Sequence, residues 1–181
     1  VYGRLRHKPE PGTLVQAYGR VQFWRPRSQL SMRVERLEPS GEGLLRARIE
    51  ELRRRLEAEG LLAPERRRPL PLLPRRIGLV TSGDGAARDD FLGNAWARFP
   101  EADVLLVDVP VQGDPAPALI ARAITHLDRR RDVEVIVVAR GGGSLEDLMA
   151  FNSEPVCRAI AAAATPVVSA VGHERDVTLC D

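Results

Sequence analysis

The sequence predicts an α/β protein: an open, mostly parallel sheet with flanking helices, preceded by a partial antiparallel β module and a connector helix. From residue 76 onward, four apolar runs alternate with helical patterns at the spacing of βαβ units. Residues 12–38 instead alternate apolar and polar side chains with a period of two, which is typical of half-buried strands. A proline- and arginine-rich stretch at residues 63–75 separates the two patterns and marks a domain boundary.

The N-terminal part is predicted to form strands, because residues 15–23 and 30–34 alternate apolar with polar side chains. Two or three strands rarely make a stable sheet alone, so we expect a β module whose beginning is missing. Its unpaired strand edge could drive self-association between chains. The aromatic residues Tyr18, Phe23 and Trp24 could stack on bases, although strand aromatics more often pack in a core.

A helix is predicted after these strands. Apolar residues recur at helical spacing at Leu45, Ile49, Leu52 and Leu56. Gly60 is typical of the residue that follows a helix, and the prolines between residues 63 and 75 stiffen the connection that comes next. We therefore divide the chain into residues 1–40, 41–75 and 76–181.

The third part alternates strands and helices. Strands are predicted at residues 77–81, 104–109, 133–140 and 167–171, and helical segments at residues 86–98, 115–127 and 144–163. Parallel strands joined by right-handed crossovers bring their carboxyl ends to one edge of the sheet, where ligands bind in open α/β folds. The residues expected at that edge are Thr81, Ser82, Asp90, Gln112, Arg140, Gly141 to Gly143, His173 and Asp176.

The composition is that of a globular protein, with 44% hydrophobic and 29% charged residues. No apolar run is long enough to cross a bilayer and Val1 does not begin a signal peptide, so we expect a cytoplasmic protein. Cys157 and Cys180 lack metal-ligand spacing and are expected to be reduced, packed thiols. Of the 27 basic residues all but Lys8 are arginine, in clusters that suit phosphate backbones, although a solvated surface explains most such runs.

The segment after the third predicted strand carries the clearest functional signal. The apolar strand runs into Arg140, three glycines and Ser144. Gly141 to Gly143 allow positive φ and have no Cβ, so their N–H groups can approach an oxyanion, while Arg140 adds a full positive charge. Ser144 is expected to cap a helix whose first amides add further donors. The acids Glu146 and Asp147 could complement the helix dipole, repel a ligand, hold a metal or pair with Arg140.

Four motifs, in this order and spacing, resemble the catalytic domain of the exonuclease VII large subunit: TSGDGAARDD, VPVQGD, ARGGGSLEDLMAFNSE and ATPVVSAVGHERDVTLCD. The stretch GEGLLRARIEELRRRLEAEGLL is similar to that family's connecting helix after an N-terminal OB-fold. The resemblance covers nearly the whole chain and implies a single-strand-specific exodeoxyribonuclease that digests DNA from both ends to short oligonucleotides.

The same resemblance implies an organisation for the three parts of the chain. Residues 1–40 are then part of an OB-fold, residues 41–75 a connector helix and linker, and residues 76–181 a catalytic domain that continues beyond the last residue. It implies single-stranded DNA and a small subunit as partners of the full-length protein. The helical region that recruits the small subunit is expected to be absent from this chain.

The family motifs also imply four catalytic residues: Asp90 in GAAxxD, Arg140 in RGGGS, and His173 and Asp176 in GHExD. The phosphate-binding positions are expected at Thr81, Ser82, Gly141, Gly142, Gly143 and Ser144. Phosphodiester hydrolysis needs proton transfer and positive charge near the phosphoryl oxygens. An imidazole exchanges a proton near neutral pH, so His173 is the candidate for that step. Asp90 or Asp176 could orient it, polarise a water or bind Mg²⁺ or Mn²⁺, and the need for a metal stays open.

Two other functions are compatible with the sequence. A non-catalytic single-strand binder would hold DNA without cleaving it under any metal condition. A nucleotide-binding small-molecule enzyme would use the glycine loop for a mononucleotide phosphate, but the chain has no Gly-x-Gly-x-x-Gly fingerprint and Lys8 is far from any glycine loop. Each acid also has a purely structural interpretation, as a residue that complements a helix dipole or closes a turn.

Overall fold

The computed structural model describes residues 15–24, 29–39 and 41–181. The chain forms two compact units that meet in sequence between Glu50 and Glu51. The strand residues expected at positions 12–14 lie outside the described residues. In the part of the chain that the structure describes, no helix has the length and apolar character needed to span a membrane.

The first unit contains a two-stranded antiparallel sheet, as the alternating pattern predicts. Strand β1 (Val15–Trp24) pairs with β2 (Gln29–Pro39), and the register shifts once, between Tyr18 and Gly19. Phe23 is 60% exposed and Tyr18 is 39% exposed, so neither of these aromatic side chains lies in a core. The guanidinium of Arg36 lies 4.3 Å from the centre of the Tyr18 ring. The side chain of Trp24 lies outside the described residues.

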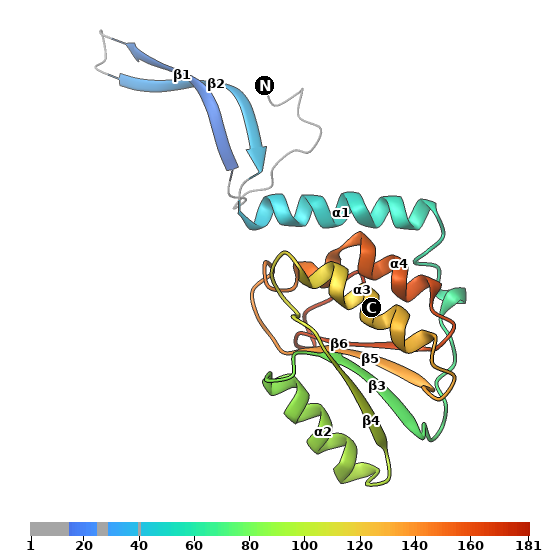
Figure 1. Ribbon diagram of the computed structural model, residues 1–181. Helices are drawn as coiled ribbons and strands as arrows, with labels where there is room; N and C mark the ends of the chain where they lie inside the picture. The colour runs from blue at the N-terminus through green and yellow to red at the C-terminus, as the bar shows by residue number, and fades with distance from the viewer. Residues whose placement is uncertain (1–14, 25–28, 40) are drawn as a thin grey trace. The chain divides into compact units, whose positions relative to one another are not determined.

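The second unit is built on a four-stranded parallel sheet, which confirms the predicted fold class. The strand order is β4 (Asp103–Asp108), β3 (Arg76–Thr81), β5 (Val135–Arg140) and β6 (Val167–Val171). Helices α3 (Ala116–Asp128) and α4 (Glu154–Ala162) cover one face, and α2 (Ala86–Arg98) lies on the other face (Figure 1). Every strand therefore ends at the same edge of the sheet.

Strand β5 is buried along its whole length, because it has a strand on each side and helices on both faces. Ile136 and Val138 pack into the cluster that includes Ile120 of α3. Val135 and Val137 point to the opposite face and pack into the cluster that Phe91 of α2 joins. Because both faces of the strand are buried, its sequence is a continuous apolar run and does not alternate apolar with polar residues.

The connector forms helix α1 (Glu42–Ala58), a short 3-10 turn η3 (Pro64–Arg66) and an extended linker. Gly60 follows α1 with φ of +69°, as expected for a helix end. Two arginines of this segment bond to α4 and its C-terminal end. Arg66 donates a hydrogen bond to the carbonyl oxygen of Ala161 at 3.0 Å, and Arg68 donates one to the carbonyl oxygen of Ala163 at 2.8 Å. These bonds satisfy carbonyls at the C-terminus of α4, where cations are favoured.

The predicted helix over residues 144–163 is only partly formed. Residues 145–148 form turns, η4 (Met149–Asn152) is a 3-10 helix, and regular α-helix begins at Glu154. The expectation that Ser144 caps a helix is therefore corrected: Ser144 caps a single turn. The Leu148 amide donates an i+4 hydrogen bond to the Ser144 carbonyl, and the backbone bonds that follow are i+3 bonds. This tighter winding accompanies the burial of Leu148, Phe151 and Asn152 in the interior of the second unit.

Burial of the second half of α1 gives a stability prediction. Leu56 is fully buried, so Leu56→Ala should lower the free energy of unfolding by about 2–5 kcal/mol through lost burial and a residual cavity. Urea unfolding monitored by circular dichroism measures the change. Leu73, which is 65% exposed, supplies the matched Leu→Ala control and should leave stability nearly unchanged. Equal effects of the two substitutions would contradict the burial of Leu56 in the second unit.

Candidate active site at the carboxyl edge of the sheet

Arg140 is the last residue of β5 and brings a charge to the end of a buried strand. Its side chain is only 9% exposed. Nη2 donates a hydrogen bond to Oε1 of Gln112 at 3.0 Å, and Nη1 donates to the carbonyl oxygen of Gly141 at 3.3 Å. Nη2 also lies 3.7 Å from Oδ2 of Asp147, which forms an ion pair without a short hydrogen bond. These acceptors make a buried guanidinium tolerable and fix its position.

The three glycines after Arg140 expose backbone donors beside this guanidinium. Gly141, Gly142 and Gly143 are exposed, and their amides have no hydrogen-bond acceptor among the residues that the structure describes. None of the three has positive φ, so the expected use of that conformation is corrected. The lack of a Cβ is what matters: a Cβ on Gly142 would overlap the imidazole of His173, and one on Gly143 would overlap the guanidinium of Arg140.

Ser144 closes the loop with Asp147 rather than leaving its donors free. Oδ2 of Asp147 accepts hydrogen bonds from the Ser144 amide at 3.0 Å and from the Ser144 hydroxyl at 2.8 Å. The pKa of the Asp147 carboxyl is lowered, first by the Ser144 hydroxyl, then by the Ser144 amide and by Arg140. Of the four roles considered for this acid, the structure therefore supports pairing with Arg140, combined with closure of the loop.

His173 and Asp176 come from the turn after β6. Gly172 adopts φ of +74°, which starts the turn, and its amide donates to the carbonyl oxygen of Arg140 at 2.9 Å. Oδ2 of Asp176 accepts a hydrogen bond from the His173 amide at 2.8 Å and lies 3.4 Å from Nδ1 of the same residue. The His173 side chain is 78% exposed. Asp176 thus contacts both the amide and the ring of His173, and Nε2 has no hydrogen-bond partner among the described residues.

Asp90 has no hydrogen bond or ion pair with this group. It is an exposed residue of α2, and its carboxylate makes no hydrogen bond or ion pair within the described residues; only its backbone oxygen is used, by the side chain of Asn94. The structure brings together Arg140, the glycine loop, His173 and Asp176, and no hydrogen bond or ion pair joins Asp90 to them. A helix residue can be placed near the edge from sequence, but the direction of its side chain cannot.

The end of β3 contributes a second loop. Thr81 is 1% exposed, so its hydroxyl can contact a ligand only if the residues that cover it move. Ser82 Oγ donates to Oδ1 of Asp84 at 2.6 Å, and this bond lowers the pKa of the Asp84 carboxyl. Asp108, at the end of β4, accepts a hydrogen bond from the Gly83 amide at 2.7 Å. Asp108 was not among the predicted site residues, although an acid near the end of the strand predicted at residues 104–109 was a usable signal.

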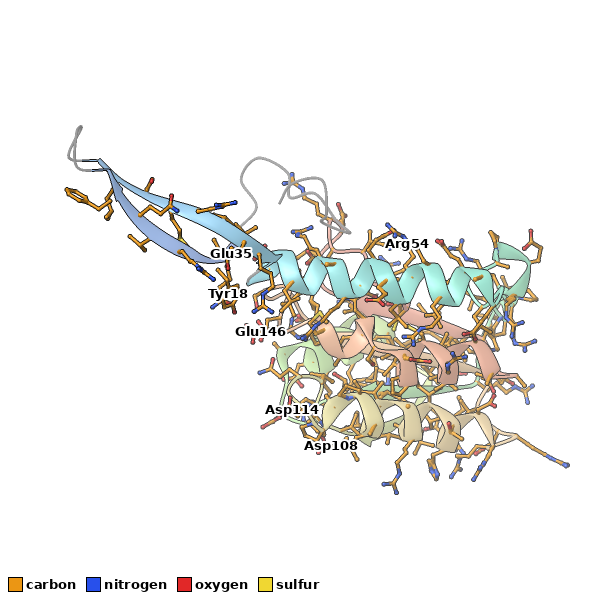
Figure 2. All side chains as sticks on the ribbon, turned by 90° about the horizontal axis from the view of Figure 1, so that it is seen from above. Tyr18, Glu35, Arg54, Asp108, Asp114 and Glu146 are labelled. Carbon is orange, nitrogen blue, oxygen red and sulfur yellow. The ribbon has the colours of Figure 1, made fainter. Side chains whose placement is uncertain are left out.

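The edge also carries exposed acids. Figure 2 shows Asp108, Asp114 and Glu146 at the same end of the second unit. Within the described residues, no group of three acidic, histidine or cysteine side chains is placed to hold a metal. Asp90 and Asp176 therefore do not form a protein-only cage, and a Mg²⁺ or Mn²⁺ ion here would need phosphate oxygens and water to complete its coordination.

The carboxyl edge of this parallel sheet presents a guanidinium held by hydrogen bonds, glycine amides without acceptors among the described residues and a histidine beside an aspartate, and open α/β sheets bind ligands at this edge. The sequence model of the family "Exonuclease VII, large subunit" matches residues 61–181. The chain belongs to the exonuclease VII large subunit family.

Curated relatives agree with this assignment. The exodeoxyribonuclease 7 large subunit of Desulfitobacterium hafniense is 47% identical over 178 residues, which are 98% of this chain and 44% of that protein. The protein of the same name from Thioalkalivibrio sulfidiphilus is 49% identical over 98% of this chain and 40% of its own length. That from Streptomyces coelicolor is 49% identical over 94% of this chain and 42% of its own length. The chain thus spans about two fifths of the length of these relatives.

The contact between Gly142 and His173 gives a prediction specific to the site. Gly142→Ala should displace the imidazole, because the new methyl group would occupy its position. The chain has three histidines, so the ring resonances of His173 can be followed by NMR without crowding. Gly141→Ala is the matched control, since nothing lies within 4 Å of the position that its methyl group would take, and it should leave the His173 signals in place. Unchanged His173 resonances in Gly142→Ala would contradict the observed packing.

Proposed function

We propose that this chain carries the catalytic centre of a single-strand-specific exodeoxyribonuclease that hydrolyses DNA from both ends to short oligonucleotides. The observation that carries the proposal is the shared edge of Arg140, the free amides of Gly141 to Gly143 and the His173–Asp176 pair. The large-subunit names of its relatives support the same activity for the full-length protein. Residues 76–181 are the proposed catalytic part, residues 41–75 the connector, and residues 1–40 part of an OB-fold that holds DNA.

Each group has a proposed role in phosphodiester hydrolysis. Arg140 and the glycine amides neutralise the charge that develops on the phosphoryl oxygens. His173 transfers a proton through its open Nε2, while Asp176 holds the ring at Nδ1. Asp90 has no partner to constrain it among the described residues, and its proposed role is to polarise the attacking water or to bind a metal together with the substrate phosphate. Thr81, Ser82 and Ser144 shape the two loops around the phosphate.

The proposed partners follow from the family. Single-stranded DNA is the proposed substrate, as the resemblance to the family implies. A small subunit joins the full-length protein, as the name "large subunit" of the relatives indicates. The proposed location is the cytoplasm, where chromosomal DNA is accessible.

The nuclease proposal is tested with end-labelled single-stranded and duplex DNA, in EDTA, in Mg²⁺ and in Mn²⁺. The wild-type chain should cleave the single strand and spare the duplex. His173→Ala should reduce the rate by about 100-fold or more, because general acid–base catalysis is lost. His126→Ala, on α3, is the matched control and should cleave at the wild-type rate. Binding without cleavage in every lane would favour a non-catalytic binder, and tight binding of mononucleotides without length dependence would favour a small-molecule enzyme.

Self-association through the β1–β2 sheet is a separate proposal. Val21 pairs with Met32 and Phe23 with Leu30 in register, and all four are at least 44% exposed on one face. Sedimentation should therefore detect concentration-dependent dimers, and Phe23→Glu should abolish them by placing a charge in the apolar face. A strict monomer at high concentration would contradict the proposal.

A further inference from the structure

Gln112 lies at the carboxyl edge and is bonded to Arg140, although none of the roles proposed for phosphodiester hydrolysis uses its side chain. It belongs to the loop between β4 and α3, next to Gly113, whose φ of +82° turns the chain toward the helix. Its Oε1 lies 3.0 Å from Nη2 of Arg140. Gln112 is the one side chain that accepts a hydrogen bond from Arg140 in the part of the chain that the structure describes. The position of the guanidinium therefore depends on this loop.

The hydrogen bond also fixes the orientation of the Gln112 amide. A guanidinium has five N–H donors and no acceptor, so only the oxygen of the glutamine amide can face Arg140. The amide nitrogen must then turn away from the guanidinium. Nε2 has no acceptor among the described residues, and Gln112 is exposed, so two further N–H donors are open to a ligand beside the guanidinium.

A neutral acceptor preserves the charge on which a phosphate site depends. Gln112 holds the guanidinium without contributing a negative charge. The nearest acid, Asp147, stays 3.7 Å from Nη2 and uses the same oxygen for the amide and hydroxyl of Ser144. A carboxylate at position 112 would hold Arg140 equally well, but it would neutralise the guanidinium and repel a phosphate.

We propose that Gln112 is a phosphate-binding and positioning residue: its carbonyl oxygen holds Arg140 and its amide nitrogen donates to the same bound phosphate group. The inference rests on the proposed function in one respect, the presence of a phosphate at this edge. It adds a donor from the loop after β4 to those of the glycine loop after β5, so that a phosphate is held by loops that follow the strands on either side of β3.

The test uses two variants to separate the acceptor of Gln112, which holds Arg140, from its donor, which would bind phosphate. Gln112→Met keeps the length of the side chain and removes both the acceptor and the donor. The double variant Gln112→Glu with Asp114→Asn keeps an acceptor for Arg140 and the net charge of the loop, because Asp114 is an exposed residue of the same loop (Figure 2). The probe is inorganic phosphate, titrated while the amide resonances of Gly141 to Gly143 are followed by NMR. The thermal midpoint of each protein is measured in parallel.

Phosphate should shift the glycine amides of the wild-type chain, and the dissociation constant should rise about tenfold in both variants, as for the loss of one charge-assisted hydrogen bond. The thermal midpoint should fall by several degrees in Gln112→Met, where the buried guanidinium loses its acceptor, and should be retained in the double variant. A purely structural role would instead make phosphate affinity follow thermal stability.

Three results would overturn the inference. Wild-type affinity in Gln112→Met would show that the amide takes no part in binding. Restored affinity in the double variant would show that an acceptor for Arg140 is sufficient and that the amide nitrogen of Gln112 donates nothing to the phosphate. A wild-type chain whose glycine amides do not respond to phosphate would remove the phosphate site itself. Phosphate binding that depends on Gln112, in a chain that does not cleave DNA, would leave the inference standing and count against the nuclease proposal alone.

Discussion

The buried charge of Arg140 is the constraint on which the rest of the edge depends. A guanidinium at the end of a fully buried strand is tolerated only when acceptors surround it, and here they come from Gln112, Gly141 and Asp147. The lack of a Cβ at Gly143 leaves room for the guanidinium. The carbonyl oxygen of Arg140 in turn accepts the amide of Gly172, which fixes the start of the His173 turn. One residue thereby connects the three loops that form the site.

The polar groups at the two edges of the sheet differ in whether they have partners within the protein. At the amino edge, Arg76 pairs with both Asp103 and Asp132, and Arg130 also pairs with Asp132. These pairs hold the pKa of the Asp132 carboxyl well below its usual range, mainly through the hydrogen bond from Arg130, and their charges are mutually satisfied. At the carboxyl edge the glycine amides and the open side of His173 have no partner among the described residues. Satisfied charges stabilise the fold, whereas unsatisfied donors are available to a ligand.

Much of this architecture follows from the sequence, because hydrophobic periodicity determines which faces are buried. The apolar run ending at Arg140 predicted the strand that the structure forms as β5, and α2 has the predicted bounds of residues 86–98. What the sequence could not provide was the direction of individual side chains. Asp90 is exposed on α2, and Ser144 closes a turn with Asp147. Gly142 and Gly143 are needed because a Cβ would overlap a neighbouring side chain, and not because they adopt positive φ. Each of these outcomes depends on packing between segments far apart in the chain, which local propensity does not determine.

The central claim is that a DNA phosphate binds where Arg140, the glycine amides and His173 meet. A crystal structure of the chain with a short phosphorothioate oligonucleotide, which resists cleavage, tests it most directly. We expect a phosphate within hydrogen-bond distance of the Gly142 and Gly143 amides and of the Arg140 guanidinium, with Nε2 of His173 facing an ester oxygen. An oligonucleotide bound only along the linker arginines Arg66 to Arg68, with the carboxyl edge empty, would contradict the claim.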